Sequence, residues 1–454
     1  MKDQQTLATR PQLLDTFMKI DTLITARWII PIEPANTILD NHAIAINDGR
    51  IVAILPATEA EAQFQPDIHI HRDQHVLMPG FINTHGHAAM SLMRGLADDL
   101  PLMDWLNNHI WPVENRWVNP EFVHDGSLLA CAEMIKSGTT CFNDMYFFPD
   151  ETARAAEHAG MRAVVGLIVL DFPTAWAQDA DEYLHKGIAL HDQLSGNNLI
   201  RTAFAPHAPY TVSDDPLTRV GTYAEELEIP IHIHLHETAV EVQDSMEKFG
   251  MRPIARLQKL ELLSPRLLAV HMTQLEKDEI SLLADTGVHV AHCPESNLKL
   301  ASGFCPVQTL IEAGVNVALG TDSAASNNDL DMAGEMRSAA LLAKAVAGNA
   351  SAVPAMQALE MATINGARAL GLDEEIGSLK PGKAADMIAI DLSGVDTQPI
   401  YHPESQVVYS AGRHCIRDVW VAGRQLLRDG ELTTLNPAAI LERSREWREK
   451  LAEH

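Results

Sequence analysis

The stretch that decides the fold is Pro79-Gly80-Phe81-Ile82-Asn83-Thr84-His85-Gly86-His87. Its apolar run predicts a strand, and the Pro-Gly pair marks where that strand begins. Alternate side chains of a strand share one face, so His85 and His87 are expected to point the same way at its end. Two imidazoles at this spacing can bind one metal ion. The end of a barrel strand is a typical place for such a catalytic site.

The central part of the chain repeats a strand followed by a helix. Eight apolar segments predict strands, at residues 81–85, 139–143, 163–170, 202–205, 230–236, 267–271, 288–292 and 315–320. Helical stretches such as residues 216–227 and 333–347 lie between them. This alternation is typical of βα units in a parallel sheet, and eight of them predict a (β/α)8 TIM barrel over residues 76–372.

The segments that flank the barrel also predict short strands, at residues 23–30, 43–46, 51–55, 385–390 and 419–426. Asp48-Gly49 lies between two of them and predicts a tight hairpin. We expect residues 1–75 and 373–454 to pack together as one small β-sandwich, because either half alone would expose an apolar edge. A terminal helix completes the second half, and residues 1–18 predict a polar tail or a short helix.

The composition excludes several classes of protein. The 454 residues include 61 acidic and 34 basic side chains, for a formal charge of -27. Nucleic acid and anionic membrane surfaces are therefore excluded as partners, which leaves a small neutral or cationic ligand. The five cysteines are scattered and form no disulfide framework or structural zinc motif. With no signal pattern and no apolar run of membrane-spanning length, we expect a cytoplasmic protein, and a homo-oligomer by default.

Histidines and one aspartate stand at the ends of five predicted strands, which core packing does not predict. They are His85 and His87, then His232, His234 and His236, then His271, His292 and Asp322. A divalent ion could take His85, His87, one histidine of the fifth strand and Asp322, with one position open for water. Zn2+ is the favoured ion, and Fe2+ and Mn2+ can use the same ligands.

Further residues at these strand ends suit acid–base chemistry. A bound divalent ion lowers the pKa of its water from about 15.7 toward about 7. Glu237 directly follows the histidines of the fifth strand and can shuttle the proton. His271 can hold or deprotonate the water, and Asp322 can carry a proton to the leaving group.

For several residues a purely structural role remains an alternative to a role in the site. His232 is expected to be structural, because His234 is the histidine three positions before Glu237. His292 either supports the site or belongs to the core. The remaining candidates are His69, His71 and His75, which we expect to be solvated, and Trp105, Trp111 and Trp117, which either pack near the site or contact the ligand.

Taken together, these motifs resemble the amidohydrolase superfamily, in the branch with one catalytic metal. The resemblance covers nearly the whole chain and is strongest at residues 79–87, 234–237, 270–271, 290–294, 320–323 and 377–386. Within that superfamily the sequence is most similar to the 5-methylthioadenosine/S-adenosylhomocysteine deaminases. The segments that suggest this are residues 85–102, 110–114, 205–211 and 296–303.

The resemblance implies hydrolytic deamination of an adenine nucleoside and a role for each matching residue. His85, His87, His234 and Asp322 would bind the metal. Glu237 would protonate the purine ring nitrogen and His271 would assist the attacking water, while Glu237 and Asp322 also contact the substrate. Glu114 would accept the ribose hydroxyls, which selects nucleosides over free bases, and His207 would contact the nucleoside.

Two alternatives remain at this stage. The first is a related hydrolase that acts on a free purine, a pyrimidine, a pterin or a triazine. The second is a non-catalytic scaffold, which the intact ligand set disfavours. Some relatives hold the homocysteine carboxylate with arginines, and Arg154, Arg162 and Arg201 are the candidates here. The preference between the two thioether nucleosides therefore stays open.

Overall fold

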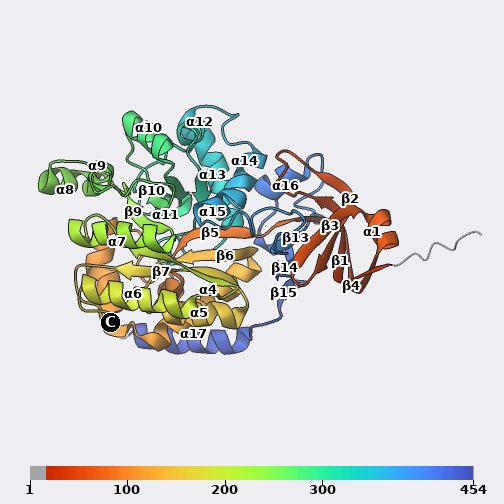
Figure 1. The fold of residues 1–454 in the computed structure, drawn as a ribbon, viewed down its shortest axis with the longest axis horizontal. Coiled ribbons are helices and arrows are strands. Elements are labelled where there is room, and N and C mark those ends of the chain that lie inside the picture. Colours follow the sequence, from red (N-terminus) through yellow and green to blue (C-terminus); the bar gives the residue numbers. More distant parts are fainter. Residues whose placement is uncertain (1–16, 453–454) are drawn as a thin grey trace, which may run out of the picture.

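The computed structural model describes residues 17–452 and consists of a barrel with a smaller β-module at one side (Figure 1). The predicted polar tail falls mostly on residues 1–16, which lie outside the described residues. None of the described helices combines the length and the apolar character that a membrane crossing requires.

Eight parallel strands form the barrel sheet, in the order β12-β11-β10-β9-β8-β7-β6-β5. They are β5 (Phe81–Gly86), β6 (Thr139–Asp144), β7 (Arg162–Val169), β8 (Ile200–Pro206), β9 (Ile231–Leu235), β10 (Leu267–His271), β11 (His289–His292) and β12 (Val317–Leu319). Each overlaps a predicted strand, so the expected TIM barrel is confirmed. The strands are almost fully buried because helices cover them.

The first and last strands lie side by side and close the barrel. Thr84 Oγ1 donates a 2.8 Å hydrogen bond to the carbonyl of Leu319, and the backbone N–H of Asp322 donates to the carbonyl of His85 at 3.0 Å. A Cβ atom at Gly320 would lie 2.8 Å from the backbone of His85. Glycine is therefore required at this crossing, which brings the ends of β5 and β12 together.

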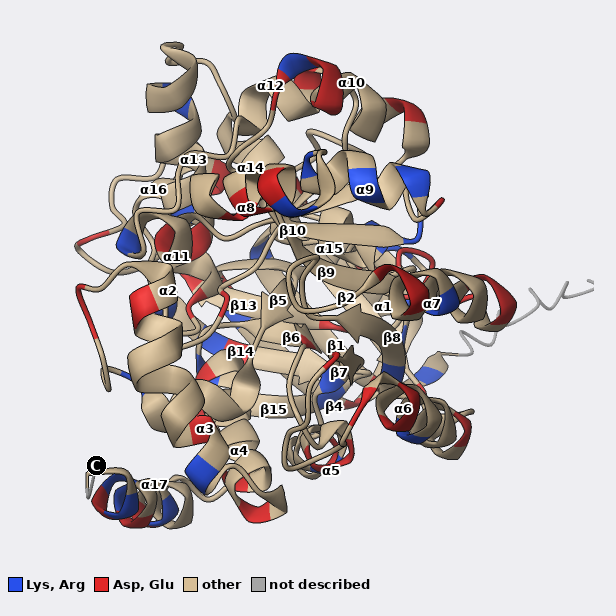
Figure 2. Cartoon of the chain, turned by 90° about the vertical axis from the view of Figure 1, so that its left-hand side faces the viewer, with Lys and Arg blue, Asp and Glu red and all other residues tan. Residues whose placement is uncertain are grey.

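Helices surround the barrel and carry most of its charged residues, whereas the strands are largely uncharged (Figure 2). They are α4 (Pro120–Lys136), α5 (Pro149–Ala159), α6 (Ala180–Leu194), α7 (Asp214–Leu227), α8 (Ala239–Phe249), α9 (Pro253–Lys259), α10 (Lys277–Thr286), α11 (Pro294–Lys299), α12 (Val307–Glu312), α13 (Met332–Ala347), α14 (Ala355–Met361) and α15 (Ile364–Ala369). The segment after β5 forms short helices over the barrel mouth, namely η1 (Ala88–Met93), α2 (Leu102–Trp105), η2 (Leu106–Ile110) and α3 (Trp111–Trp117).

Both ends of the chain build the second sheet, as expected, in the order β16-β15-β14-β13-β4-β1-β2-β3. Its elements are β1 (Met18–Ile29), β2 (Leu39–Asn47), β3 (Arg50–Pro56), α1 (Ala57–Gln63), β4 (Phe64–Pro79), β13 (Met387–Asp391), β14 (Ile416–Val421), β15 (Arg424–Arg428) and β16 (Glu431–Leu432), with α16 (Pro403–Tyr409) and η3 (Arg413–Cys415) between strands. The sheet folds over itself, since Gly49 in the β2–β3 turn lies against Ala422 and Gly423 beyond β14. Asp48 and Gly49 have φ of 49° and 73°, the conformation that a two-residue hairpin turn needs.

The long strand β4 has no counterpart among the predicted strands. It lies parallel to β1 and antiparallel to β13, and so joins the two halves of the module before it leads into β5. The module is tied to the barrel through the buried Arg162, which donates to Asp386 at 3.0 Å and to Glu375 at 3.1 Å. The terminal helix α17 (Pro437–Leu451) packs on α4, where Trp447 donates to Asp125.

Candidate active site

Four of the predicted site residues converge at the C-terminal end of the barrel. Nε2 of His85 and Nε2 of His87 each lie 3.2 Å from Asp322 Oδ1. Nε2 of His234, on β9, lies 3.2 Å from Nε2 of His85. Ends of the first, fifth and eighth barrel strands thus contribute to one cluster.

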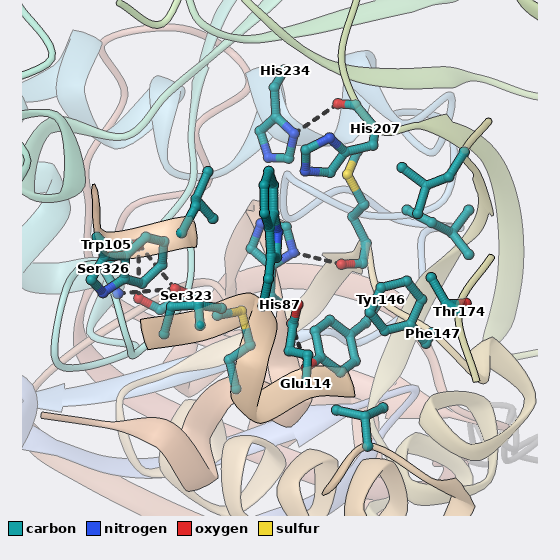
Figure 3. Close-up of a pocket in the computed structure, with 18 of the residues that line it drawn as sticks. His87, Trp105, Glu114, Tyr146, Phe147, Thr174, His207, His234, Ser323 and Ser326 are labelled. Atoms are coloured by element: carbon teal, nitrogen blue, oxygen red, sulfur yellow. Dashed lines mark hydrogen bonds between the residues drawn. The ribbon is translucent and has the colours of Figure 1, made fainter. Parts of the chain in front are cut away.

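Nδ1 of each of the three imidazoles already has a hydrogen-bond partner outside the cluster. Nδ1 of His87 donates to the carbonyl of Met145 at 2.5 Å, and Nδ1 of His234 donates to the carbonyl of His207 at 2.8 Å (Figure 3). Nδ1 of His85 lies 2.8 Å from Nε2 of His232. With these Nδ1–H groups donating outward, the Nε2 lone pairs face the centre of the cluster.

The carboxylate of Asp322 is fixed from behind by two hydroxyl groups. Ser296 and Ser326 donate to its Oδ2 at 2.6 and 3.0 Å, which leaves Oδ1 toward the histidines. Burial alone would raise the pKa of Asp322, but hydrogen bonds and charge from His85 and His87 hold that pKa well below its ordinary value. The carboxylate is therefore ionised inside the barrel.

This donor set fits one divalent cation. Three imidazole lone pairs and one carboxylate oxygen point at a common centre, and the ligand atoms of His85, His87 and His234 lie within 4.8 Å of one another. Nitrogen and oxygen ligands in this number are those of catalytic zinc sites and their relatives. A buried carboxylate is also stabilised by a positive charge beside it.

Two more predicted residues lie beside the cluster and can move protons. His271 Nε2 lies 3.7 Å from Glu237 Oε2, and both side chains are buried in the cavity wall. Nδ1 of His271 is 2.9 Å from Asn297 Oδ1, an acceptor, so Nδ1–H donates there and Nε2 is left for a second partner. Burial raises the pKa of Glu237, helped by the negative charge of Asp322, which favours a protonated carboxyl group there.

The backbone that carries Glu237 is held by a second, buried carboxylate. Glu241 Oε1 accepts from the backbone N–H of His236 at 3.0 Å, and Oε2 accepts from that of Glu237 at 2.7 Å. Thr238 caps α8 by accepting from the backbone N–H of Glu241 at 3.2 Å. The start of α8 thereby fixes the backbone of His236 and Glu237, which follow β9.

A cavity of about 410 Å³ opens from the cluster to the barrel mouth. This volume lies within the range of roughly 300–1,000 Å³ that is typical of small-molecule sites. Glu114 lies in its wall and accepts a 2.8 Å hydrogen bond from the hydroxyl of Tyr146 (Figure 3). Burial raises the pKa of Glu114 to about 7, although the Tyr146 bond and the nearby His87 act to lower it.

On the side of the cavity near His234 lies His207, whose ring centroid is 4.9 Å from that of His234. Its Nδ1 lies 2.9 Å from Thr211 Oγ1, which itself donates to the carbonyl of Ala208. Nδ1–H of His207 is therefore the donor, and Nε2 remains an acceptor. Burial lowers the pKa of His207 to about 3, so the ring is neutral.

The rest of the cavity wall is mostly apolar and aromatic. It includes Met90, Leu102, Trp105, Leu106, Ile110, Trp111, Val118, Phe147, Ile168, Leu170 and Phe172. Among the described residues that line the cavity there is no lysine or arginine. Arg162 is bound to Asp386, and Arg154 donates to Glu151 on α5, so neither reaches the cavity.

The structure also places residues for which the sequence had left alternatives. His232 contacts His85 rather than the centre of the cluster, while His292 is buried at the end of β11. Trp105 and Trp111 line the cavity, whereas Trp117 does not. Tyr146, Ser326 and Glu241 were missed as functional residues. The position of Tyr146 just beyond a predicted strand end was the available signal for that residue.

The fold and the site together define a barrel hydrolase that depends on a divalent metal. Residues 76–426 match the model of the amidohydrolase family. A 5-methylthioadenosine/S-adenosylhomocysteine deaminase of Saccharophagus degradans is 52% identical over 431 residues, which is 95% of this chain and 97% of the relative. A protein of the same name from Teredinibacter turnerae is also 52% identical, over 95% of this chain and 98% of that relative.

Solved structures of similar proteins have the same fold. A crystal structure of an adenosine deaminase from Xanthomonas campestris with bound zinc superposes with a TM-score of 0.96 at 52% identity, covering 96% of this chain and all of the other. An atrazine chlorohydrolase of Arthrobacter aurescens complexed with zinc shares the fold at 23% identity, with a TM-score of 0.87 over 94% of this chain and 100% of the other. The chain belongs to the amidohydrolase family, and within it to the group of the 5-methylthioadenosine/S-adenosylhomocysteine deaminases.

Proposed function

We propose that the protein is a hydrolytic deaminase of adenine nucleosides, which converts 5-methylthioadenosine, S-adenosylhomocysteine or both to the inosine analogue and ammonia. The observation that carries this proposal is the arrangement of the cavity. The ligand cluster, the Glu237–His271 pair and the Glu114–Tyr146 pair face one volume of about 410 Å³. The names of the relatives at 52% identity support the same substrate class.

His85, His87, His234 and Asp322 would hold the divalent ion. When bound, this ion supplies a hydroxide nucleophile at neutral pH. Zn2+ is the ion we propose, since imidazole and carboxylate ligands suit it and the similar Xanthomonas campestris structure contains zinc.

The side chains around the cluster account for the proton transfers of a deamination. Attack at carbon 6 of the purine requires a proton on the adjacent ring nitrogen, and Glu237 would donate it. His271 would orient the attacking water with its free Nε2 and accept a proton from it. Asp322 would then take the proton of the hydroxyl group added at carbon 6 and pass it to the amino group, which leaves as ammonia while the carbon 6 carbonyl forms.

The other side of the cavity would select a nucleoside. An ionised Glu114 can accept from two adjacent hydroxyl groups, which the ribose provides and a free base lacks. His207 would accept a hydrogen bond from the nucleoside through Nε2. The apolar wall would cover the thioether substituent at the 5′ position.

Comparison of substrates tests the proposal. We expect ammonia release from 5-methylthioadenosine or S-adenosylhomocysteine, and far slower release from adenine and guanine. E114Q should lose about 10²-fold or more in kcat/KM on the nucleosides and little on the free bases, because a buried partner of the ribose is removed. Equal turnover of nucleosides and free bases by the wild-type enzyme would contradict the proposed substrate class.

We further propose a cytoplasmic homo-oligomer. The five cysteines are free and buried in the structure, which agrees with a reducing compartment. Most soluble oligomers are homo-oligomers with closed symmetry.

A further inference from the structure

The β-module carries a second group of potential metal ligands, on side chains that the deaminase site does not use. His69 and His71 lie two residues apart on β4, so both point to the same face of the sheet. Glu61 approaches them from the neighbouring helix α1. One ligand atom from each of the three lies within 4.8 Å of the others. Figure 1 shows α1 and β1 at the end of the molecule away from the barrel.

The side chains of Glu61, His69 and His71 lie close together although all three are exposed. The ring centroids of His69 and His71 are 4.0 Å apart with an interplanar angle of 39°. Nε2 of His69 lies 4.0 Å from Glu61 Oε1. In the part of the chain that the structure describes, Glu61 forms no ion pair with a lysine or an arginine. Because all three side chains are exposed, core packing does not explain why they meet.

A buried hydroxyl group holds the ring of one of the histidines through its Nδ1. Thr25 on β1 donates through Oγ1 to the carbonyl of Ile70 at 3.4 Å, and this Oγ1 lies 2.9 Å from Nδ1 of His71. In the tautomer of His71 that carries its hydrogen on Nδ1, Nδ1–H donates to Oγ1 and Nε2 keeps its lone pair for a metal ion. Histidines that bind metals are commonly oriented by such a bond from the other ring nitrogen.

We propose that Glu61, His69 and His71 form a second divalent metal site, which takes Zn2+, Ni2+ or Cu2+. Two imidazoles and a carboxylate prefer these borderline ions to Mg2+ or Ca2+, whose ligands are mainly oxygen. Two ligands of one tetrahedral Zn2+ lie about 3.4 Å apart. Small rotations of these exposed side chains bring their ligand atoms to this separation. Water fills the remaining coordination positions of the ion. A bound ion would join α1 to β4.

Metal binding to the tag-free enzyme, with its catalytic site already loaded, tests this proposal. We expect isothermal titration with Zn2+ to detect one further equivalent per chain, and Mg2+ to give none. H69A and H71A should weaken this binding by about tenfold or more. T25V should weaken it by about 10–100-fold, because the bond that orients His71 is lost. H42A, which changes a histidine of β2 in the same sheet, should bind the extra Zn2+ as the wild type does.

Deaminase activity and melting temperature without added Zn2+ serve as the check on folding, and both should match the wild type in every variant. Added Zn2+ should raise the melting temperature of the wild type and of H42A, and not that of H71A. The proposal is overturned if the loaded enzyme binds no further Zn2+, or if H69A and H71A bind it as tightly as the wild type. Neither result would bear on the deaminase site, since the two sites share no residue.

Discussion

The hydroxyl of Tyr146 donates a 2.8 Å hydrogen bond to Oε1 of Glu114 inside the cavity. The two residues come from different parts of the chain, since Glu114 lies on α3 and Tyr146 follows β6. Burial disfavours the carboxylate and raises the pKa of Glu114 to about 7, while the Tyr146 bond favours the carboxylate. The charge of Glu114 is therefore poised to change near neutral pH.

This relationship predicts how substrate binding depends on pH. Because the folded-state pKa is raised, Glu114 becomes neutral as the pH falls through about 7 and loses an acceptor for the ribose. We expect kcat/KM for the nucleoside to fall by about tenfold for each pH unit below that point. Y146F removes the bond that favours the ionised form, so the midpoint should move upward by about one pH unit. A pH profile of kcat/KM measures both effects.

E114Q is the control for this experiment, because its side chain does not titrate. Its profile should lack the step near pH 7 and keep only those of the other groups in the cavity. An unchanged step in both Y146F and E114Q would assign the pH dependence to another residue.

The contact between His85 and His232 predicts an effect on metal affinity. H232L removes the acceptor for Nδ1–H of His85, so the orientation of that ligand is no longer fixed. We expect the affinity for the catalytic ion to fall by about 10–100-fold, measured by competition with a chelator. H292L changes another buried histidine at a strand end and is the matched control. Equal loss of affinity in both variants would mean that burial, not the His85 bond, is responsible.

The two bonds that Glu241 accepts predict that it positions Glu237. E241Q keeps one oxygen acceptor and turns an amide N–H₂ group toward the other backbone N–H. We expect kcat to fall by about tenfold or more with little change in KM, because proton donation and not ribose binding is affected. The exposed E247Q on the same helix should behave as the wild type. A rise in KM with kcat unchanged would argue against this role.

The uncharged wall of the cavity predicts a substrate preference. Among the described lining residues no cation is available for the carboxylate of a homocysteine group, so 5-methylthioadenosine should have a higher kcat/KM than S-adenosylhomocysteine. Phe172 lines the cavity and is 41% exposed at its edge. F172R should raise kcat/KM for S-adenosylhomocysteine relative to 5-methylthioadenosine, while V395R, at a fully exposed position, should not. Faster turnover of S-adenosylhomocysteine by the wild type would contradict the prediction.

The barrel was predictable because short apolar segments that alternate with helical stretches mark its strands. The segments 267–271 and 81–85 coincide with β10 and β5 to within one residue. The strand β4 was not predictable in the same way. Its residues 64–75 include charged and polar side chains such as Asp67, Arg72 and Asp73, and its pairing with β1 and β13 depends on other parts of the chain.

The sequence by itself determined the barrel, the family resemblance and the residue types of the site, because strand periodicity and strand-end motifs are local properties. The tertiary structure alone decided which lone pairs face the centre, since that depends on distant partners such as His232 and Met145. It also decided that Tyr146 would meet Glu114, and that His69 and His71 would share a surface with Glu61. Such contacts arise only when helices and strands pack against one another, so a sequence pattern within one element does not encode them.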